Sequence, residues 1–281
     1  MRVDIGGGVR LFVDVVGSSL EPTRDEMRER PTLLLLHGGP GMDHAGFRPY
    51  FDRFADTHQV VYYDHRGNGR SDGFDDPSGW DLDTWADDVV RLCDALEVTD
   101  PVVLGNSFGG FVAMAYAARH PDHPAKIVLS STQARRHAEE TGRRFEELGG
   151  PEARENYESV FVRLESDRGL RYLTENMPLY NRRPSDFGPN RTIMNLPLLV
   201  DFTSTFGEYD VRDLLPRITC PTLVLCGADD PMTPVVASKE IMSLLAPAVG
   251  RYELFEDCGH GSYRDQPERT EAVLRSFLGS D

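Results

Sequence analysis

The sequence lacks several features that mark particular protein classes. Only four of its 281 residues are cysteines, Cys93, Cys220, Cys226 and Cys258, and none of them forms a CxxC pair. Neither a disulfide framework nor a zinc site is therefore expected, and the thiols are expected to be reduced and packed in the core. No run of eighteen apolar residues occurs, and charged residues and glycines interrupt the N-terminal stretch where a signal peptide would be apolar. We therefore expect a cytoplasmic protein without a membrane span.

Basic residues are scarce relative to acidic ones. Thirty lysines and arginines face forty-six aspartates and glutamates, which gives a formal charge of −16. Such a surface repels phosphate backbones and anionic lipids, so we expect neither a nucleic-acid partner nor a membrane partner. The 40% of hydrophobic residues is ordinary, and a chain of this length can bury one sizeable core. One large domain, or one domain with an insertion, is the expected organisation.

Short apolar runs predict the strands of the core. They occupy residues 32–37, 59–64, 101–106, 125–131, 222–227 and 251–256. Because these runs are apolar without alternation, both faces of each strand should be buried, as in a parallel sheet. Residues 9–16, preceded by three glycines, predict an opening hairpin, whereas the charged stretch 20–31 is expected to be a solvated loop.

Helical patterns separate these runs. They occupy residues 47–56, 83–96, 108–120, 234–246 and 267–278. In the second of them Trp85, Val89, Leu92 and Leu96 follow one another at spacings of four, three and four, which places them on one face of a helix. Alternating strands and helices predict an α/β fold with a doubly wound, mostly parallel sheet.

One long interval breaks this alternation. Between Gln133 and Leu215 no strand-like run occurs, and the segment is rich in Arg, Glu, Tyr and Phe. A structureless loop of this length is implausible inside a compact domain, so a helical insertion is expected. We expect residues 133–212, here called the insertion, to form a lid before the penultimate strand, and residues 1–132 and 213–281 to form the core.

A serine lies where the third buried strand runs into a helix, in the sequence GNSFG at residues 105–109. Glycines two positions before and after a serine allow the sharp turn of a nucleophile elbow, which exposes the hydroxyl above the sheet. This context favours Ser107 as a nucleophile. The backbone N–H of Phe108, at the start of the helix, would then face the reacting group.

A serine nucleophile needs a base, and the base needs a carboxylate to orient it. Of the eight histidines, His260 follows the last strand and should lie at the same sheet edge as Ser107. In this architecture the acid stands between the serine and the histidine in the chain. Asp229 and Asp230 both follow the penultimate strand, so these residues leave two candidates for the acid.

Taken together, these motifs resemble the α/β-hydrolase superfamily. They are HGGPG (37–41), DHRGNGRS (64–71), GNSFG, GADDPMTP (227–234) and CGH (258–260). HGGPG together with the DxRGxGxS pattern is most similar to the proline iminopeptidase-like branch. The resemblance implies an eight-stranded sheet, with Ser107 as nucleophile, His260 as base and Asp230 as acid. It also implies an oxyanion hole formed by the N–H groups of Gly39 and Phe108.

The expected activity is serine hydrolysis through an acyl-enzyme, without a metal or cofactor. The resemblance favours an aminopeptidase or amidase acting on a short peptide or small amide. An ester, lactone or C–C bond hydrolase of a small molecule is the alternative, because Asn106 and Phe108 replace a glycine and a tryptophan that such peptidases usually carry. A non-catalytic binding protein is disfavoured because all three triad positions are filled. A serine at the elbow, instead of an aspartate, also disfavours an epoxide hydrolase or a dehalogenase.

Two further groups of residues carry weaker expectations. Asp64, Arg66 and Ser71 of DHRGNGRS are expected to form a hydrogen-bonded turn and not to be catalytic. Recognition of a free α-amine would use carboxylates of the insertion, although most of these are expected on a solvated helix face. The candidates are Glu139, Glu140, Glu146, Glu147, Glu152, Glu155, Glu158 and Glu175.

Overall fold

The computed structural model describes residues 1–165, 168–183 and 191–279. Its centre is an eight-stranded sheet with the strand order β1-β2-β6-β5-β7-β8-β9-β10. The strands are β1 (Arg2–Asp4), β2 (Arg10–Val16), β5 (Thr32–Leu36), β6 (Gln59–Tyr63), β7 (Val102–Asn106), β8 (Lys126–Ser130), β9 (Thr222–Gly227) and β10 (Gly250–Phe255). All six strands predicted for the core are present, and they run parallel from β6 to β10.

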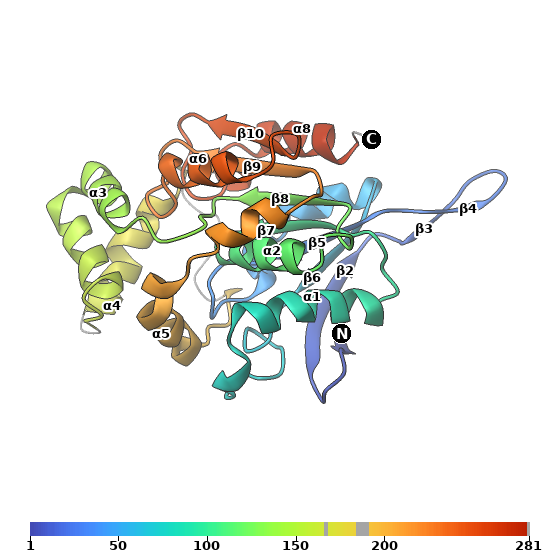
Figure 1. Ribbon diagram of the computed structural model, residues 1–281, viewed down its shortest axis with the longest axis horizontal. Coiled ribbons are helices and arrows are strands. Elements are labelled where there is room, and N and C mark those ends of the chain that lie inside the picture. Colours follow the sequence, from blue (N-terminus) through green and yellow to red (C-terminus); the bar gives the residue numbers. More distant parts are fainter. Residues whose placement is uncertain (166–167, 184–190, 280–281) are drawn as a thin grey trace.

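The N-terminal region confirms one expectation and corrects another. Strands β1 and β2 form the predicted antiparallel hairpin, and β2 joins the sheet antiparallel to β6. The stretch 20–31 is exposed, but it is not a loop: β3 (Leu20–Pro22) and β4 (Met27–Glu29) pair as a separate two-stranded ribbon. Its backbone pairs internally while its side chains stay in solvent, so the lack of apolar residues did not prevent strand pairing. The ribbon projects from one end of the molecule (Figure 1).

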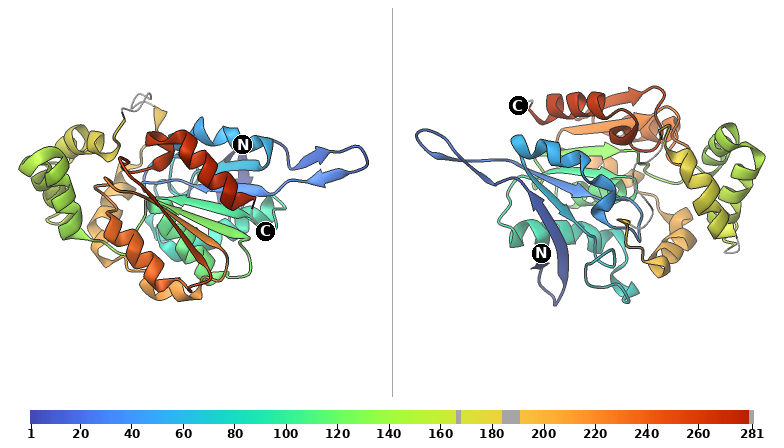
Figure 2. Two further views of the ribbon diagram at one scale, coloured as in Figure 1. Left: turned by 90° about the horizontal axis from the view of Figure 1, so that it is seen from above. Right: turned by 180° about the vertical axis from the view of Figure 1, so that it is seen from behind.

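Helices cover both faces of the sheet. The core helices are α1 (Leu82–Ala95), α2 (Phe108–Arg119), α6 (Val235–Leu244), α7 (Ser262–Asp265) and α8 (Pro267–Leu278). α1, α2 and α6 share an apolar core with one face, whereas α8 and the segment 44–56 pack on the other face (Figure 2). The α-helix expected at 47–56 is not formed, and 3₁₀ turns take its place. Two 3₁₀ turns, His44–Phe47 and Tyr50–Asp56, flank Pro49, which has no N–H to continue a helix.

The described secondary structure of the insertion is helical, apart from an isolated antiparallel β-bridge between Arg135 and Asp210. Its elements are α3 (Ala138–Phe161), the one-turn α4 (Gly169–Arg171), a π-helical turn (Tyr172–Asn176), 3₁₀ turns at Met177–Tyr180 and Phe206–Glu208, and α5 (Leu196–Thr205). A 3₁₀ turn at Arg212–Arg217 joins the insertion to the core, and another at Pro77–Gly79 lies within the core. Residues 166–167 and 184–190 of the insertion lie outside the described residues. α3 and α4 lie at the end of the molecule opposite the β3–β4 ribbon (Figure 1).

Burial follows the sequence pattern. Every residue of β5, β7 and β9 is buried, as expected for strands covered on both faces. All four cysteines are free and buried. In the ranges that the structure describes, no helix combines the length and the apolar character needed to cross a bilayer.

Candidate active site

Ser107 lies on a strained elbow between β7 and α2. Its φ of 54° and ψ of −117° are unusual for a residue with a side chain. The flanking glycines allow this turn. A Cβ at Gly105 would lie 2.2 Å from the carbonyl oxygen of Gly109, and a Cβ at Gly109 would lie 2.0 Å from that of Leu36. The glycines of GNSFG are therefore required by close backbone packing.

The end of β8 holds the elbow in place. The N–H of Ser107 donates to the carbonyl of Ser130 at 2.9 Å, and the Thr132 hydroxyl donates to the carbonyl of Ser107 at 2.8 Å. The elbow is buried apart from Ser107 itself, which is partly exposed. The serine backbone is thus fixed while its side chain stays accessible.

Asp230 and His260 are joined directly. Oδ2 of Asp230 lies 2.8 Å from Nδ1 of His260, and the two side chains are almost fully buried. Three further hydrogen bonds orient the carboxylate: the N–H groups of Met232 and Thr233 donate to Oδ1 at 2.9 Å, and the Thr233 hydroxyl donates to Oδ2 at 2.6 Å. This arrangement fixes the plane of the carboxylate and presents one oxygen to the imidazole.

Asp229 points elsewhere. Its Oδ1 accepts a hydrogen bond from Arg144 of the insertion at 3.1 Å, and the side chain is partly exposed. Arg182 lies 3.5 Å from its other oxygen. Asp229 therefore joins the core to the insertion and does not contact the imidazole.

The loop that carries His260 is anchored next to the elbow. The N–H of Gly261 donates to the Ser131 hydroxyl at 2.9 Å, one residue after the Ser130 carbonyl that holds Ser107. Within the described part of the chain, no direct hydrogen bond joins the Ser107 hydroxyl to His260. The end of β8 therefore connects the two loops.

The HGGPG loop lies against the elbow. A Cβ at Gly38 would lie 3.2 Å from Cβ of Ser107, and Gly39 has a φ of +123° that residues with a side chain rarely adopt. The N–H of Gly41 donates to the Asn68 side chain at 2.6 Å, and its carbonyl accepts from the N–H of Asn195 at 2.7 Å. The loop is held from both sides, by the DHRGNGRS turn and by the insertion.

The imidazole of His37 at the start of this loop is neutral. The N–H of His65 donates to Nε2 of His37, so the ring proton lies on Nδ1, which is 2.7 Å from the Gly38 carbonyl. Burial lowers the pKa of both His37 and His65 below the ordinary histidine value. His37 thus acts as a structural hydrogen-bonding group under the loop.

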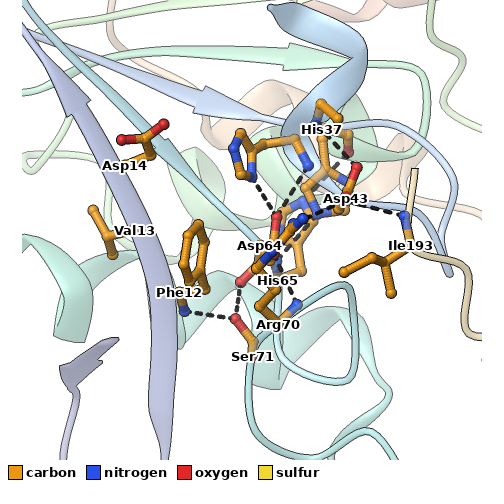
Figure 3. A network of polar contacts seen from close by, with 12 residues as sticks. Phe12, Val13, Asp14, His37, Asp43, Asp64, His65, Arg70, Ser71 and Ile193 are labelled. Carbon is orange, nitrogen blue, oxygen red and sulfur yellow. Dashed lines mark hydrogen bonds and ion pairs between the residues drawn. The ribbon is translucent and has the colours of Figure 1, made fainter. Parts of the chain in front are cut away.

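DHRGNGRS forms a hydrogen-bonded turn through Asp64 and Ser71, as expected (Figure 3). The Arg66 side chain bonds outside the turn instead, because it donates to both carboxylate oxygens of Asp88 in α1, at 2.7 and 2.6 Å. Oδ1 of the buried Asp64 accepts from Nδ1 of His44 at 2.6 Å, its Oδ2 accepts from the N–H of Arg70, and its carbonyl accepts from the Ser71 hydroxyl. Burial alone would raise the pKa of Asp64, but that pKa is lowered, and the hydrogen bonds from His44 and from the N–H of Arg70 contribute to this.

Asp43 extends this network to the insertion (Figure 3). Its Oδ2 accepts from Arg70 at 3.0 Å and from the N–H of Ile193 at 3.1 Å, and its Oδ1 caps the following 3₁₀ turn through Ala45. Asp43 was not among the residues expected at the site, although an aspartate directly before a short helical turn is a capping signal. Asp265 and Asn181 also contact the His260 loop and were not expected there, because no local sequence signal marks them.

The glutamates of the insertion are engaged on its surface, as expected for most of them. Arginines pair with them as follows: Arg154 with Glu139, Glu146 and Glu158, Arg143 with Glu140 and Glu147, Arg171 with Glu152, and Arg163 with Glu155. Glu175 accepts from Asn156 at 2.9 Å. In the described residues, His, Cys, Asp and Glu form no group of three that could hold a metal ion.

Comparisons with known proteins agree with this architecture. A family model described as the alpha/beta hydrolase fold matches residues 31–267. Proline iminopeptidase of Lactiplantibacillus plantarum is 30% identical, over 97% of this chain and 98% of that protein. The crystal structure of proline iminopeptidase from Mycobacterium smegmatis has a TM-score of 0.74 at 22% identity, over 99% of this chain and 97% of the other. An esterase from Exiguobacterium antarcticum has a TM-score of 0.73 at 21% identity, over 100% and 99%.

Proposed function

The chain belongs to the α/β-hydrolase family and is a proline iminopeptidase-like hydrolase, and on this premise we propose that Ser107, His260 and Asp230 are its catalytic triad. The observation that carries the proposal is the 2.8 Å hydrogen bond from the imidazole of His260 to the buried, fully oriented carboxylate of Asp230. The strained elbow of Ser107, anchored to the same end of β8 as the His260 loop, supports it.

In the proposed mechanism His260 takes the proton of Ser107 as the Ser107 oxygen attacks the substrate carbonyl. Asp230 holds the Nδ1–H tautomer of His260, so Nε2 is the basic nitrogen, and Asp230 stabilises the imidazolium that forms. The imidazolium then protonates the leaving group as its bond to the carbonyl carbon breaks. In the second half, His260 takes a proton from the water that attacks the acyl-enzyme and returns it to the Ser107 oxygen as the acyl group leaves as an acid. No step requires a metal or cofactor.

The backbone N–H groups of Gly39 and Phe108 are proposed to bind the oxyanion. Phe108 begins a helix of twelve residues, whose N-terminal N–H groups favour negative charge. The contact of Gly38 with Ser107 brings the HGGPG loop beside the nucleophile. Two donors from different loops would thus meet over one carbonyl oxygen.

We propose that residues 133–212 form a lid over a core of residues 1–132 and 213–281. Ile193 and Asn195 of the insertion bind the HGGPG loop and its neighbours, and Tyr180 binds the His260 loop. These contacts support the proposed lid, because they join the insertion to both loops of the proposed site. The proposed substrate is a short peptide or small amide from which an N-terminal residue is released.

A fluorophosphonate probe tests the catalytic claim. We expect it to label the wild-type protein and not the Ser107→Ala variant, because only an activated serine attacks the phosphorus atom. Equal labelling of both proteins, or of neither, would refute the claim. Thermal unfolding of Ser107→Ala is the control for folding.

An ester hydrolase is the second candidate, favoured by one observation. The glutamates of the insertion that could receive a free α-amine are bound to arginines or to Asn156. The esterase from Exiguobacterium antarcticum has a similar fold. Turnover of aminoacyl arylamides by wild type, measured with Ser107→Ala as blank, would support the peptidase. Turnover of short acyl esters alone would support the esterase.

A further inference from the structure

Hydrogen bonds and a ring contact join the loop that contains His260 to residues 180 and 181 of the insertion. The N–H of His260 donates to the carbonyl of Tyr180 at 2.5 Å, and the Asn181 side chain donates to the carbonyl of His260 at 2.9 Å. The rings of Tyr180 and His260 meet edge to face at 5.1 Å. Both backbone hydrogen-bonding groups of His260 are therefore satisfied by residues of the insertion, about 80 positions away in the chain.

A buried carboxylate holds these two segments together. Asp265 is 1% exposed, and its Oδ2 accepts from the N–H of Gly259 at 2.7 Å and from the N–H of Arg182 at 3.0 Å. Its Oδ1 accepts from the N–H of Arg183 at 3.0 Å. One side chain thus satisfies three backbone donors, one directly before His260 and two directly after Asn181.

Close packing leaves little freedom in this contact. A Cβ at Gly259 would lie 2.0 Å from the carbonyl oxygen of Tyr180. The two backbones therefore touch, and Asp265 supplies charge-assisted acceptors to both. Loss of an acceptor oxygen would leave one of these N–H groups without its partner, and the buried N–H of Gly259 would be the most costly to leave unsatisfied, so the segments could separate.

From these contacts we infer that Asp265 is a positioning residue, which aligns His260 with Ser107 by clamping residues 181–183 of the insertion to the His260 loop. The inference rests on the proposed function, in which His260 is the base. It makes the alignment of the base depend on the seating of the insertion. Asp265 does not itself contact the reacting atoms in this scheme.

The Asp265→Asn variant tests this role. An amide has one acceptor oxygen, and its NH₂ group would face at least one of the three N–H donors. We expect kcat to fall by about ten- to a hundredfold with KM changed by less than about threefold, because a displaced base slows the chemical step of bound substrate. The rate of fluorophosphonate labelling should fall in parallel. In NMR spectra the hydrogen-bonded Nδ1 proton of His260 should shift or broaden.

Asp257→Asn is the matched control. Asp257 lies in the same loop and contacts Arg182 at 3.5 Å, but its side chain is 84% exposed. This variant should keep the wild-type kcat, labelling rate and His260 resonance. Asn181→Ala provides an independent test, because it removes the donor to the carbonyl of His260 and should lower kcat in the same direction.

The kinetics of Asp265→Asn and Asn181→Ala either support or overturn the positioning role of Asp265. A folded Asp265→Asn protein with wild-type kcat per labelled site would overturn it, and so would a loss of activity explained wholly by a smaller folded fraction. If Asp265→Asn does not fold, a wild-type kcat for Asn181→Ala overturns the inference and a reduced kcat supports it. Failure of the probe to label wild type would instead refute the proposed function.

Discussion

The carboxylate of Asp230 lies 2.8 Å from Nδ1 of His260, while the adjacent Asp229 binds Arg144 at the edge of the insertion. Two neighbouring aspartates in one turn thus have different partners and different exposure. The turn that follows β9 directs Asp230 inward, because Met232 and Thr233 bind its carboxylate through their N–H groups. This difference leads to the first prediction.

Asp230→Asn should lower kcat by about 10³–10⁴-fold, because an amide cannot accept the Nδ1–H and stabilises the wrong tautomer. Asp229→Asn should keep kcat close to wild type, because Asp229 does not contact the imidazole of His260. Its partly exposed ion pairs also contribute little to the stability of the fold. Steady-state kinetics on the best substrate would measure both variants. A larger loss for Asp229→Asn would assign the acid to that residue instead.

Gly39→Ala should lower kcat by about a hundredfold, the typical cost of losing one oxyanion donor. Its φ of +123° is unfavourable for alanine, and the new Cβ would lie 3.1 Å from the Met42 nitrogen, so the loop must move. Gly6→Ala is the control: it has a φ of +82° and no atom within 4 Å of its Cβ. Both variants pay a backbone cost of about 1–2 kcal/mol, but only Gly39→Ala should change kcat.

Gly109→Ala should prevent folding or lower the free energy of unfolding by more than about 4 kcal/mol. The added Cβ would lie 2.0 Å from the carbonyl oxygen of Leu36, and neither α2 nor β5 can move without disrupting the core. Gly169→Ala, where the Cβ meets nothing within 4 Å, should unfold like wild type. Urea unfolding followed by circular dichroism would compare the two variants. A wild-type midpoint for Gly109→Ala would contradict this packing.

Acidification should destabilise the protein through His37 and His65. Burial holds the pKa of each below the ordinary value of 6.5, so below that pH the unfolded chain binds more protons than the folded one. Stability should therefore be full above about pH 6.5 and fall as the pH drops toward the lower folded-state pKa. Each kcal/mol lost lowers Tm by about 2–4 °C.

Thermal unfolding of wild type and His65→Gln at about pH 7.5 and about pH 5.5 would measure this effect. The variant has no ionisable group at position 65, so its Tm should fall less between the two pH values, even if it starts lower. An equal fall in both proteins would show that His65 does not contribute to the acid sensitivity.

Much of the fold followed from the sequence because its signals are local. β5, β7 and β9 are apolar on both faces, and α1 has an apolar stripe, so their burial was predictable. The turn at Ser107 was predictable because only glycines fit beside it. The errors fell where local signals were weak: exposed strands pair in the ribbon at 20–29, and Pro49 divides the helical turns at 44–56.

The sequence by itself determined the order of the elements and a short set of site candidates, because hydrophobic pattern and turn chemistry act over a few residues. The tertiary structure decided which candidates touch. Asp229 and Asp230 are equivalent in chain order, and only the path of the turn brings the carboxylate of Asp230 into hydrogen-bonding contact with His260. Asp265 shows the same limit, since its partners at 182 and 183 lie more than 80 residues away and meet it only when the chain folds.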